Sequence, residues 1–429
     1  MSRSDASGPT GGAIGKRAVR WALALAVLIV IGAIALRMAL QPERLTRFVL
    51  HAVGETLGLE ITATGVGEYR LRGSPMLVAR DVVARLPGSA VPVLRAQRLL
   101  VQVPWTTVRS RGAVLDIERI ELDAPVVDVA ALQAWLASRP AGDGGIPTLR
   151  RGLQVRDGRI DGKGWSVRKF DVDLPVLHAG RHVAARVRGQ AVSGPMRGRF
   201  DLAVALTQPA NGAGFAAFGP ADVVRGDTSV PMQVQLAGRA LIGSGTLQVA
   251  PMRLAVAGTV HGPAMELPFA AALDGPLRLD GSAWTLGPAG LVTRGEGLVP
   301  RLDAAGRLRL ADGSLGIALR GRIARWPASW PALPPLSQSP NPLGLKVDYH
   351  GAPDLSGDAR LRLDWDGASA DVRLGLFEGL AWTRAAATGT PLPPLAGKAR
   401  IPVLDVAGAT LEGIEIEFEP PAAARGPRP

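Results

Sequence analysis

The amino-acid sequence predicts a mainly β fold, in which an N-terminal transmembrane helix precedes an elongated, mostly antiparallel β-sheet with one or two short helices. The first observation is alternation. In "RIELDAPV" (residues 119–126) apolar and polar side chains alternate as on a strand with one apolar face, and the pattern returns almost to the end of the chain. The second is the supply of turn residues, 53 Gly and 35 Pro without a collagen-like period. The third is one long uncharged run near the N-terminus.

The composition is that of a folded protein without cysteine chemistry. The 429 residues are 47% hydrophobic and 20% charged, which is ample for a buried core. The absence of cysteine excludes disulfides and thiolate metal sites. A formal net charge of +12 favours anionic partners such as phospholipid headgroups, lipopolysaccharide or nucleic acid. The arginines are scattered, however, which is also the pattern of ordinary solvated charges.

Residues 21–40 are predicted to form a single transmembrane anchor. The uncharged run "WALALAVLIVIGAIAL" begins at Trp21 and follows three basic residues. A helix extended to Leu40 would be about 30 Å long, enough to cross a bilayer. The basic residues predict that residues 1–20 lie in the cytoplasm and that the residues after the anchor are exported, which in a bacterium with two membranes means an inner-membrane protein whose bulk lies in the periplasm. A cleaved signal peptide is the alternative, because Ala33-Ile34-Ala35 has the small-x-small form of a cleavage site.

Two helical segments interrupt an otherwise strand-like sequence. Residues 41–58 place apolar side chains at near-helical spacing, with Pro42 suited to a first turn and Gly58 to a stop. This segment is predicted to be an amphipathic helix that leaves the membrane. A second, short helix is expected at "ALQAWLAS", before the glycine-rich loop "RPAGDGGIPT".

Residues 59–419 are predicted to form one periplasmic β domain of roughly 20 strands, which at about 4.8 Å spacing would extend about 100 Å. Two hairpins are clear, with turns at Asp312-Gly313 and Asp366-Gly367 between alternating segments. A third turn is expected at Asp157-Gly158. The proline-rich stretch 326–343 is predicted to be a loop, because proline removes ladder donors. Residues 420–429 are predicted to be disordered.

Motifs for catalysis or cofactor binding are missing from the sequence. No Gly-rich phosphate loop, nucleophile elbow or HExxH is present, so we expect no enzyme activity and no cofactor. His178 and His182 have the separation of a helical metal pair, but a turn explains "HAGRH" better, and no metal is expected. Asp171 and Asp173 are explained as solvated charges. With 4% aromatic residues and export-directed features, the chain is not expected to bind nucleic acid.

The chain resembles the AsmA-like family of inner-membrane-anchored periplasmic proteins. The resemblance rests on the anchor, on "LGLEITATGVGEYRLRGSPMLVARDVVARL" and "VLRAQRLLVQVPWTTVRSRGAVLDIERIELDAPVVDV", on "LQVRDGRIDGKGWSVRKFDVDLP" and on the ending "LDVAGATLEGIEIEFEP". It covers most of residues 15–419. It implies an elongated, curved sheet that forms a hydrophobic groove, and a bridge-like lipid carrier that supports phospholipid traffic to, and biogenesis of, the outer membrane. The expected partners are a phospholipid or another envelope lipid, the inner membrane and, because this chain is short for the family, an envelope protein.

A sheet with one apolar face must cover that face, and helices sufficient to do so are not predicted here. Lipid acyl chains would provide the cover in an open groove. The predicted lining comprises Phe200, Leu202, Val204, Leu308, Leu310, Leu361, Leu363, Val372 and Leu374. Three alternatives stay open: a closed sandwich or barrel in which the apolar faces are simply core, a lipid-free scaffold subunit of an envelope secretion or assembly machine, and an outer-membrane barrel, which the anchor and the few aromatic residues disfavour.

Overall fold

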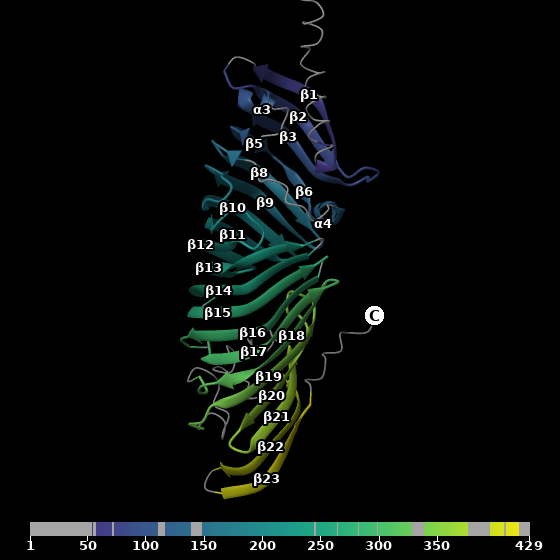
Figure 1. Ribbon diagram of the computed structural model, residues 1–429. Coiled ribbons are helices and arrows are strands. Elements are labelled where there is room, and N and C mark those ends of the chain that lie inside the picture. Colours follow the sequence, from purple (N-terminus) through teal and green to yellow (C-terminus); the bar gives the residue numbers. More distant parts are fainter. Residues whose placement is uncertain are drawn as a thin grey trace, which may run out of the picture.

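The protein is mainly β, with one long, curved, mixed sheet and two short helices in the part of the chain that the structure describes. The computed structural model describes residues 54, 57–70, 73–109, 116–138, 148–243, 246–263, 265–281, 283–297, 299–327, 339–375, 395–406 and 409–419. Figure 1 shows the strands stacked one after another along the long axis of the molecule, from β1 (Glu60–Arg70) to β23 (Ala409–Phe418). The prediction of a mainly β fold is therefore confirmed.

The N-terminal third carries both helices and the parallel pairings. Its elements are β2 (Met76–Arg85), β3 (Pro92–Gln102), α3 (Trp105–Arg109), β4 (Asp116–Ile117), β5 (Arg119–Asp123), β6 (Val126–Asp128), α4 (Val129–Ser138), β7 (Thr148–Leu149), β8 (Leu153–Gly162) and β9 (Trp165–Leu174). Strands β5 and β6 both pair with β3 on one side and with β8, in parallel, on the other. Strands β4 and β7 form a separate two-stranded parallel sheet.

From β8 onward each strand pairs antiparallel with the next one in the chain. The remaining strands are β10 (Val183–Ser193), β11 (Met196–Leu206), β12 (Gly214–Arg225), β13 (Thr228–Gly243), β14 (Thr246–Gly262), β15 (Met265–Asp280), β16 (Ala283–Gly295), β17 (Leu302–Ala311), β18 (Ser314–Ile323), β19 (Leu343–Gly351), β20 (Asp358–Trp365), β21 (Ala368–Gly375) and β22 (Leu395–Val406). The sixteen strands from β8 to β23, together with β1–β3, β5 and β6, make a 21-stranded sheet. Its topology is a meander of hairpins, as the alternating sequence predicts.

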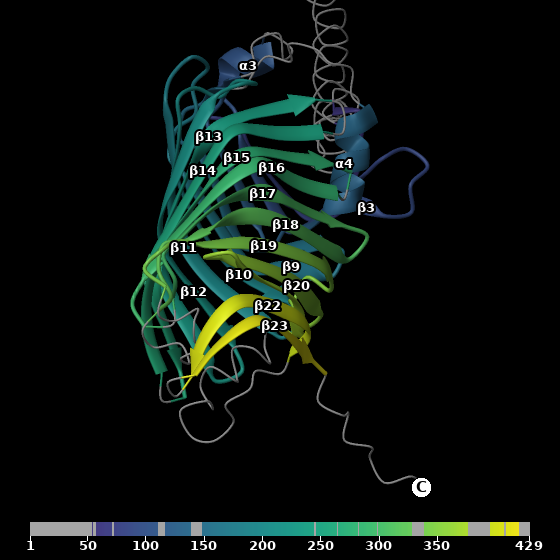
Figure 2. The same cartoon turned by 90° about the horizontal axis from the view of Figure 1, so that it is seen from below.

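A row of irregularities bends the long central strands. The register shifts between Ala237 and Ala240, Val249 and Met252, Asp274 and Leu277, and Leu286 and Ala289, in four consecutive strand pairings from β13 to β17. Such β-bulges bend a strand and increase its twist. Three of these shifts each contain a proline: Pro251, Pro276 and Pro288. Proline has no backbone N–H to donate, and at a bulge its absence does not break the ladder of hydrogen bonds. The sheet is consequently bent at one level across neighbouring strands, and Figure 2 shows the resulting open arc.

The two long edges of the arc approach each other. Arg225, at the end of β12, donates from Nη1 to the backbone oxygen of Asp354 in the β19–β20 loop at 3.2 Å, although the two strands lie seven positions apart in the sheet. Helix α4 packs on β3, β6 and β8, and its Gln133 Nε2 donates to the oxygen of Gly281 in the β15–β16 turn at 2.7 Å. These contacts show that the sheet coils as well as bends.

Short sequence motifs predict two hairpin turns and one helix correctly and one turn wrongly. The turns at Asp312-Gly313 and Asp366-Gly367 are confirmed, and all four residues have positive φ. The short helix at "ALQAWLAS" is confirmed as α4. The turn at Asp157-Gly158 is wrong, because β8 continues through both residues.

The feature at Asp157 is a bulge rather than a turn. Asp157 has a φ of 51° beside two register shifts, and its N–H donates to Asp171 Oδ1 at 2.9 Å. The hairpin closes four residues later, between Gly162 and Trp165.

Several predicted segments lie outside the described residues: the cytoplasmic tail 1–20, the anchor 21–40, almost all of the helix 41–58 and the tail 420–429. Of the proline-rich stretch, residues 328–338 also lie outside, and β19 begins at its last residue, Leu343. Among the residues described, neither helix has the length and apolar character needed to cross a membrane.

Candidate functional site

One face of the sheet, called the apolar face here, is apolar without interruption across thirteen strands, from β11 to β23. Each member of the following row is the direct cross-strand partner of the next: Val204, Ala217, Leu236, Leu254, Leu273, Leu291, Ala304, Gly321, Leu345, Leu363, Ala370, Ala399 and Ile416. At about 4.8 Å per strand, the row is roughly 58 Å long. A path of this length without a charged or polar side chain is the main feature of the site.

A second apolar row runs parallel to the first. It consists of Ala240, Val249, Leu277, Leu286, Leu308, Ile317, Tyr349, Ala359, Leu374 and Leu395. Its one polar side-chain atom is the hydroxyl oxygen of Tyr349, which donates to the backbone oxygen of Ala352 at 2.6 Å. Because that hydroxyl is satisfied within the protein, the second row offers apolar surface only.

The apolar face lies on the inside of the curve. Two clusters of buried side chains occur on it: Val249, Met252, Leu286 and Ala289 at the bend, and Ile323, Leu343, Trp365, Ala368 and Ile401 toward the C-terminal end. In a single layer, curvature crowds the side chains on the concave side, and Trp326, which follows β18, also packs on the second cluster. The leucines of the first row, by contrast, are half-buried. The described residues form no second sheet or helical layer over them, so the closed-sandwich alternative is not what the described part of the chain adopts.

All nine residues predicted to line a groove lie on the apolar face. Val204 and Leu363 belong to the first row, and Leu308 and Leu374 to the second. Phe200 and Leu202 lie four and two residues before Val204 on β11, so all three share one face. Leu310 lies two residues after Leu308 on β17 and is on the same face for the same reason. Leu361 and its cross-strand partner Val372 lie two residues from Leu363 and Leu374, respectively. Val372 is buried, and the other eight side chains are half-buried. Whether they contact a lipid stays a prediction.

Sequence reasoning missed the widest part of the apolar face, on β13–β16. Leu236, Leu254, Leu273 and Leu291 were not predicted as lining residues, although "MQVQL" and "MRLAVAG" alternate clearly. The obstacle is the bulge. Val249 and Met252 share one face on β14 although they are three residues apart, so strict alternation carried through Pro251 assigns one half of the strand to the wrong side.

The opposite face, called the polar face, is covered by cross-strand ion pairs. Arg186 donates from Nε and Nη2 to the two carboxylate oxygens of Asp201, both at 2.7 Å. Arg360 donates to both oxygens of Asp371 at 2.7 and 2.6 Å, and Arg362 adds a bond at 3.0 Å. The hydrogen bonds from Arg360, together with those from Arg362, outweigh partial desolvation and lower the pKa of Asp371 to about 2. Such bidentate pairs hold neighbouring strands in a fixed position relative to one another.

Residues considered for metal binding do not assemble into a site. His178 and His182 lie in the connection between β9 and β10, where the sequence predicts a turn. Asp171 holds the bulge at Asp157 through the bond described above. In the described ranges, no group of three or more His, Asp or Glu residues has a geometry that could hold a metal ion.

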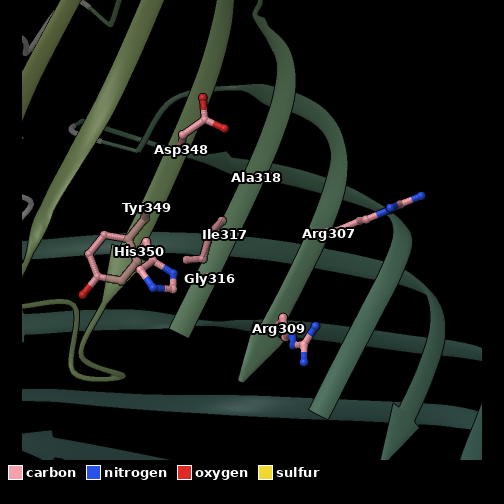
Figure 3. A pocket seen from close by; sticks show the side chains of 8 residues that line it. All are labelled: Arg307, Arg309, Gly316, Ile317, Ala318, Asp348, Tyr349 and His350. Atoms are coloured by element: carbon pink, nitrogen blue, oxygen red, sulfur yellow. The ribbon is translucent and has the colours of Figure 1, made fainter. Parts of the chain in front are cut away.

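The polar face also contains a shallow depression of about 400 Å³ over β17–β19. Figure 3 shows the eight residues that line it, among them Arg307, Arg309, Asp348 and His350. Six of the eight occupy positions on the polar face, and the other two, Ile317 and Tyr349, belong to the second apolar row.

Comparison of the chain with models of protein families, with curated proteins and with solved structures finds no match. The geometry of the two faces is thus the basis on which a function can be proposed.

Proposed function

We propose that this protein is anchored in the bacterial inner membrane and binds or conducts lipid along the apolar face of a periplasmic β-groove, in support of outer-membrane lipid homeostasis and envelope assembly. The single observation that carries the proposal is the uninterrupted apolar row from Val204 to Ile416, whose leucines are half-buried. The resemblance of the sequence to AsmA-like proteins supports the same function.

The physical reason is the free energy of apolar burial. Each methylene transferred from water to apolar surroundings contributes about 0.8 kcal/mol, so an acyl chain that covers even a few leucines binds without any specific headgroup contact. A row without charged side chains also presents no desolvation barrier to a moving chain. Transfer would need no covalent chemistry, which agrees with the expectation that the protein is not an enzyme.

Site-specific photo-crosslinking tests the proposal in the full-length chain. A photoreactive phenylalanine analogue would replace Leu254 on the apolar face or, as the matched control, Ala255, the next residue on the polar face. Crosslinks to phospholipid in cells are expected from position 254 and not from position 255. Because both variants carry the same anchor, lipid bound at the membrane contributes equally. An equal or absent yield at the two positions would reject lipid binding and leave the scaffold as the alternative function.

A further inference from the structure

The depression on the polar face exists because β18, the middle one of its three strands, has only the small residues Gly316 and Ala318 there. Two cross-strand rows pass through it, Arg309–Gly316–His350 and Arg307–Ala318–Asp348. Ala318 has only a methyl group, and a Cβ placed on Gly316 would have no neighbour closer than 3.8 Å, the nearest being Arg309 O and His350 Nδ1. In Figure 3 Arg309 and His350 lie on the two sides of Gly316, whereas Arg307 is directed away along the sheet. The floor is therefore bare backbone between two nitrogen-bearing side chains.

The Arg309 charge at this depression is not neutralised by a carboxylate, in contrast to the paired arginines described above. Arg186 and Arg360 are each held by a carboxylate, but the side chain of Arg309 is exposed and makes no ion pair or hydrogen bond within the described part of the chain. One acidic residue does line the depression. Asp348 binds Lys346 Nζ at 3.1 Å, so its charge is already offset.

A neighbouring row adds one further cation. Arg320 is exposed and makes no ion pair in the described part of the chain, whereas Lys346 opposite it is paired with Asp348, and Arg362 opposite Lys346 is paired with Asp371. The Arg320 charge therefore adds to the positive potential around the depression.

We propose that this depression binds a phosphate group, with the Arg309 guanidinium on one side and the His350 imidazole on the other. A guanidinium presents paired N–H donors that match phosphate oxygens, and a neutral imidazole can donate one ring N–H. The space over Gly316 lets the anion approach the sheet closely. The phosphate belongs either to a soluble phosphate or to a lipid headgroup, since both present the same oxygens. This inference does not depend on lipid conduction, because it concerns the opposite face.

Calorimetric titration of inorganic phosphate into the full-length chain, held in uncharged detergent, tests the proposal. Saturable binding is expected for the wild type, with affinity at least about tenfold lower in R309Q and in G316L, which fills the depression without removing charge. R253Q, an exposed arginine on the polar face of β14 outside the depression, should bind like the wild type. R309Q is a surface change, so it tests the site even if the larger side chain in G316L impairs folding.

The absence of saturable binding, or equal affinities in R309Q and R253Q, would overturn the proposal. Vesicles of phosphatidic acid in phosphatidylcholine distinguish the two phosphate sources. Displacement of bound phosphate by these vesicles, but not by phosphatidylcholine alone, supports a headgroup site. Retention of phosphate supports a site for soluble phosphate.

Discussion

Replacement of Leu254 by arginine should lower lipid affinity by more than one order of magnitude. Leu254 lies near the middle of the first apolar row, between Leu236 and Leu273. If the guanidinium displaces two methylenes of a bound acyl chain, the loss is roughly 1.6 kcal/mol, which corresponds to roughly a 15-fold weaker affinity. Burying part of a charge beside hydrocarbon adds to this loss.

The same substitution should leave the protein folded. Leu254 is half-buried, so its removal costs about 1 kcal/mol, half of what a fully buried leucine contributes. The matched control is Ala255→Arg, which places the same charge one residue away on the polar face, opposite Gln235 and Ala272. Neither direct cross-strand neighbour is charged.

The assay is a titration of the purified full-length protein with a fluorescently labelled phospholipid, with thermal unfolding as the test of folding. Leu254→Arg should bind about 15-fold more weakly than the wild type, and Ala255→Arg should bind within a factor of two of it. Equal affinities in the two folded variants would refute the reasoning, because the apolar row would then not be the lipid path.

Three further outcomes are expected. Leu310→Arg and Leu363→Arg, on the same face, should each reduce labelled-lipid binding in the same titration, and unchanged binding in both would remove these residues from the path. Asp371→Asn should lower the thermal midpoint at neutral pH. Because the folded-state pKa of Asp371 is depressed to about 2, that difference should shrink as the pH falls from about 4 toward 2, whereas a pH-independent difference would contradict the role of its arginine bonds. Gly275→Ala should destabilise the sheet by about 1–3 kcal/mol in denaturant titrations, since Gly275 has a φ of 155° and a Cβ there would lie 2.8 Å from Ala289 Cα; no change would show that the bend tolerates side chains.

The sequence predicts the hairpins well because their signals are local. Asp312-Gly313 and Asp366-Gly367 have the residues that positive φ requires, and alternation on both sides sets the faces. Leu308 and Leu361 were consequently placed on the correct face without a structure. An Asp-Gly pair alone is ambiguous, however. At Asp157 the same dipeptide forms a bulge, because Gly158 and residues 160–162 pair again with β9.

Long-range geometry could not be derived in the same way. Pro251 and Pro288 argue against central strands when read alone, yet both are accommodated at bulges in the middle of the sheet. Whether neighbouring bulges align across strands depends on register, which the alternation does not specify through a bulge. The approach of Arg225 to Asp354 depends on coiling accumulated over seven strands, and no local signal encodes it.

The two faces of the sheet solve different physical problems, and their side chains differ accordingly. If lipid moves along the apolar face as proposed, no point along it should bind the chain much more strongly than the next, and leucines interspersed with small residues such as Ala304 and Gly321 meet this requirement. A single-layer sheet must also resist collapse onto its own apolar side. The bidentate arginine pairs on the polar face and the edge contact at Asp354 oppose that collapse by fixing strands relative to one another. An apolar path that stays open in water therefore depends on the polar face as much as on the leucines. For this reason the lipid affinity of a variant on the apolar face has to be compared with that of a matched variant on the polar face.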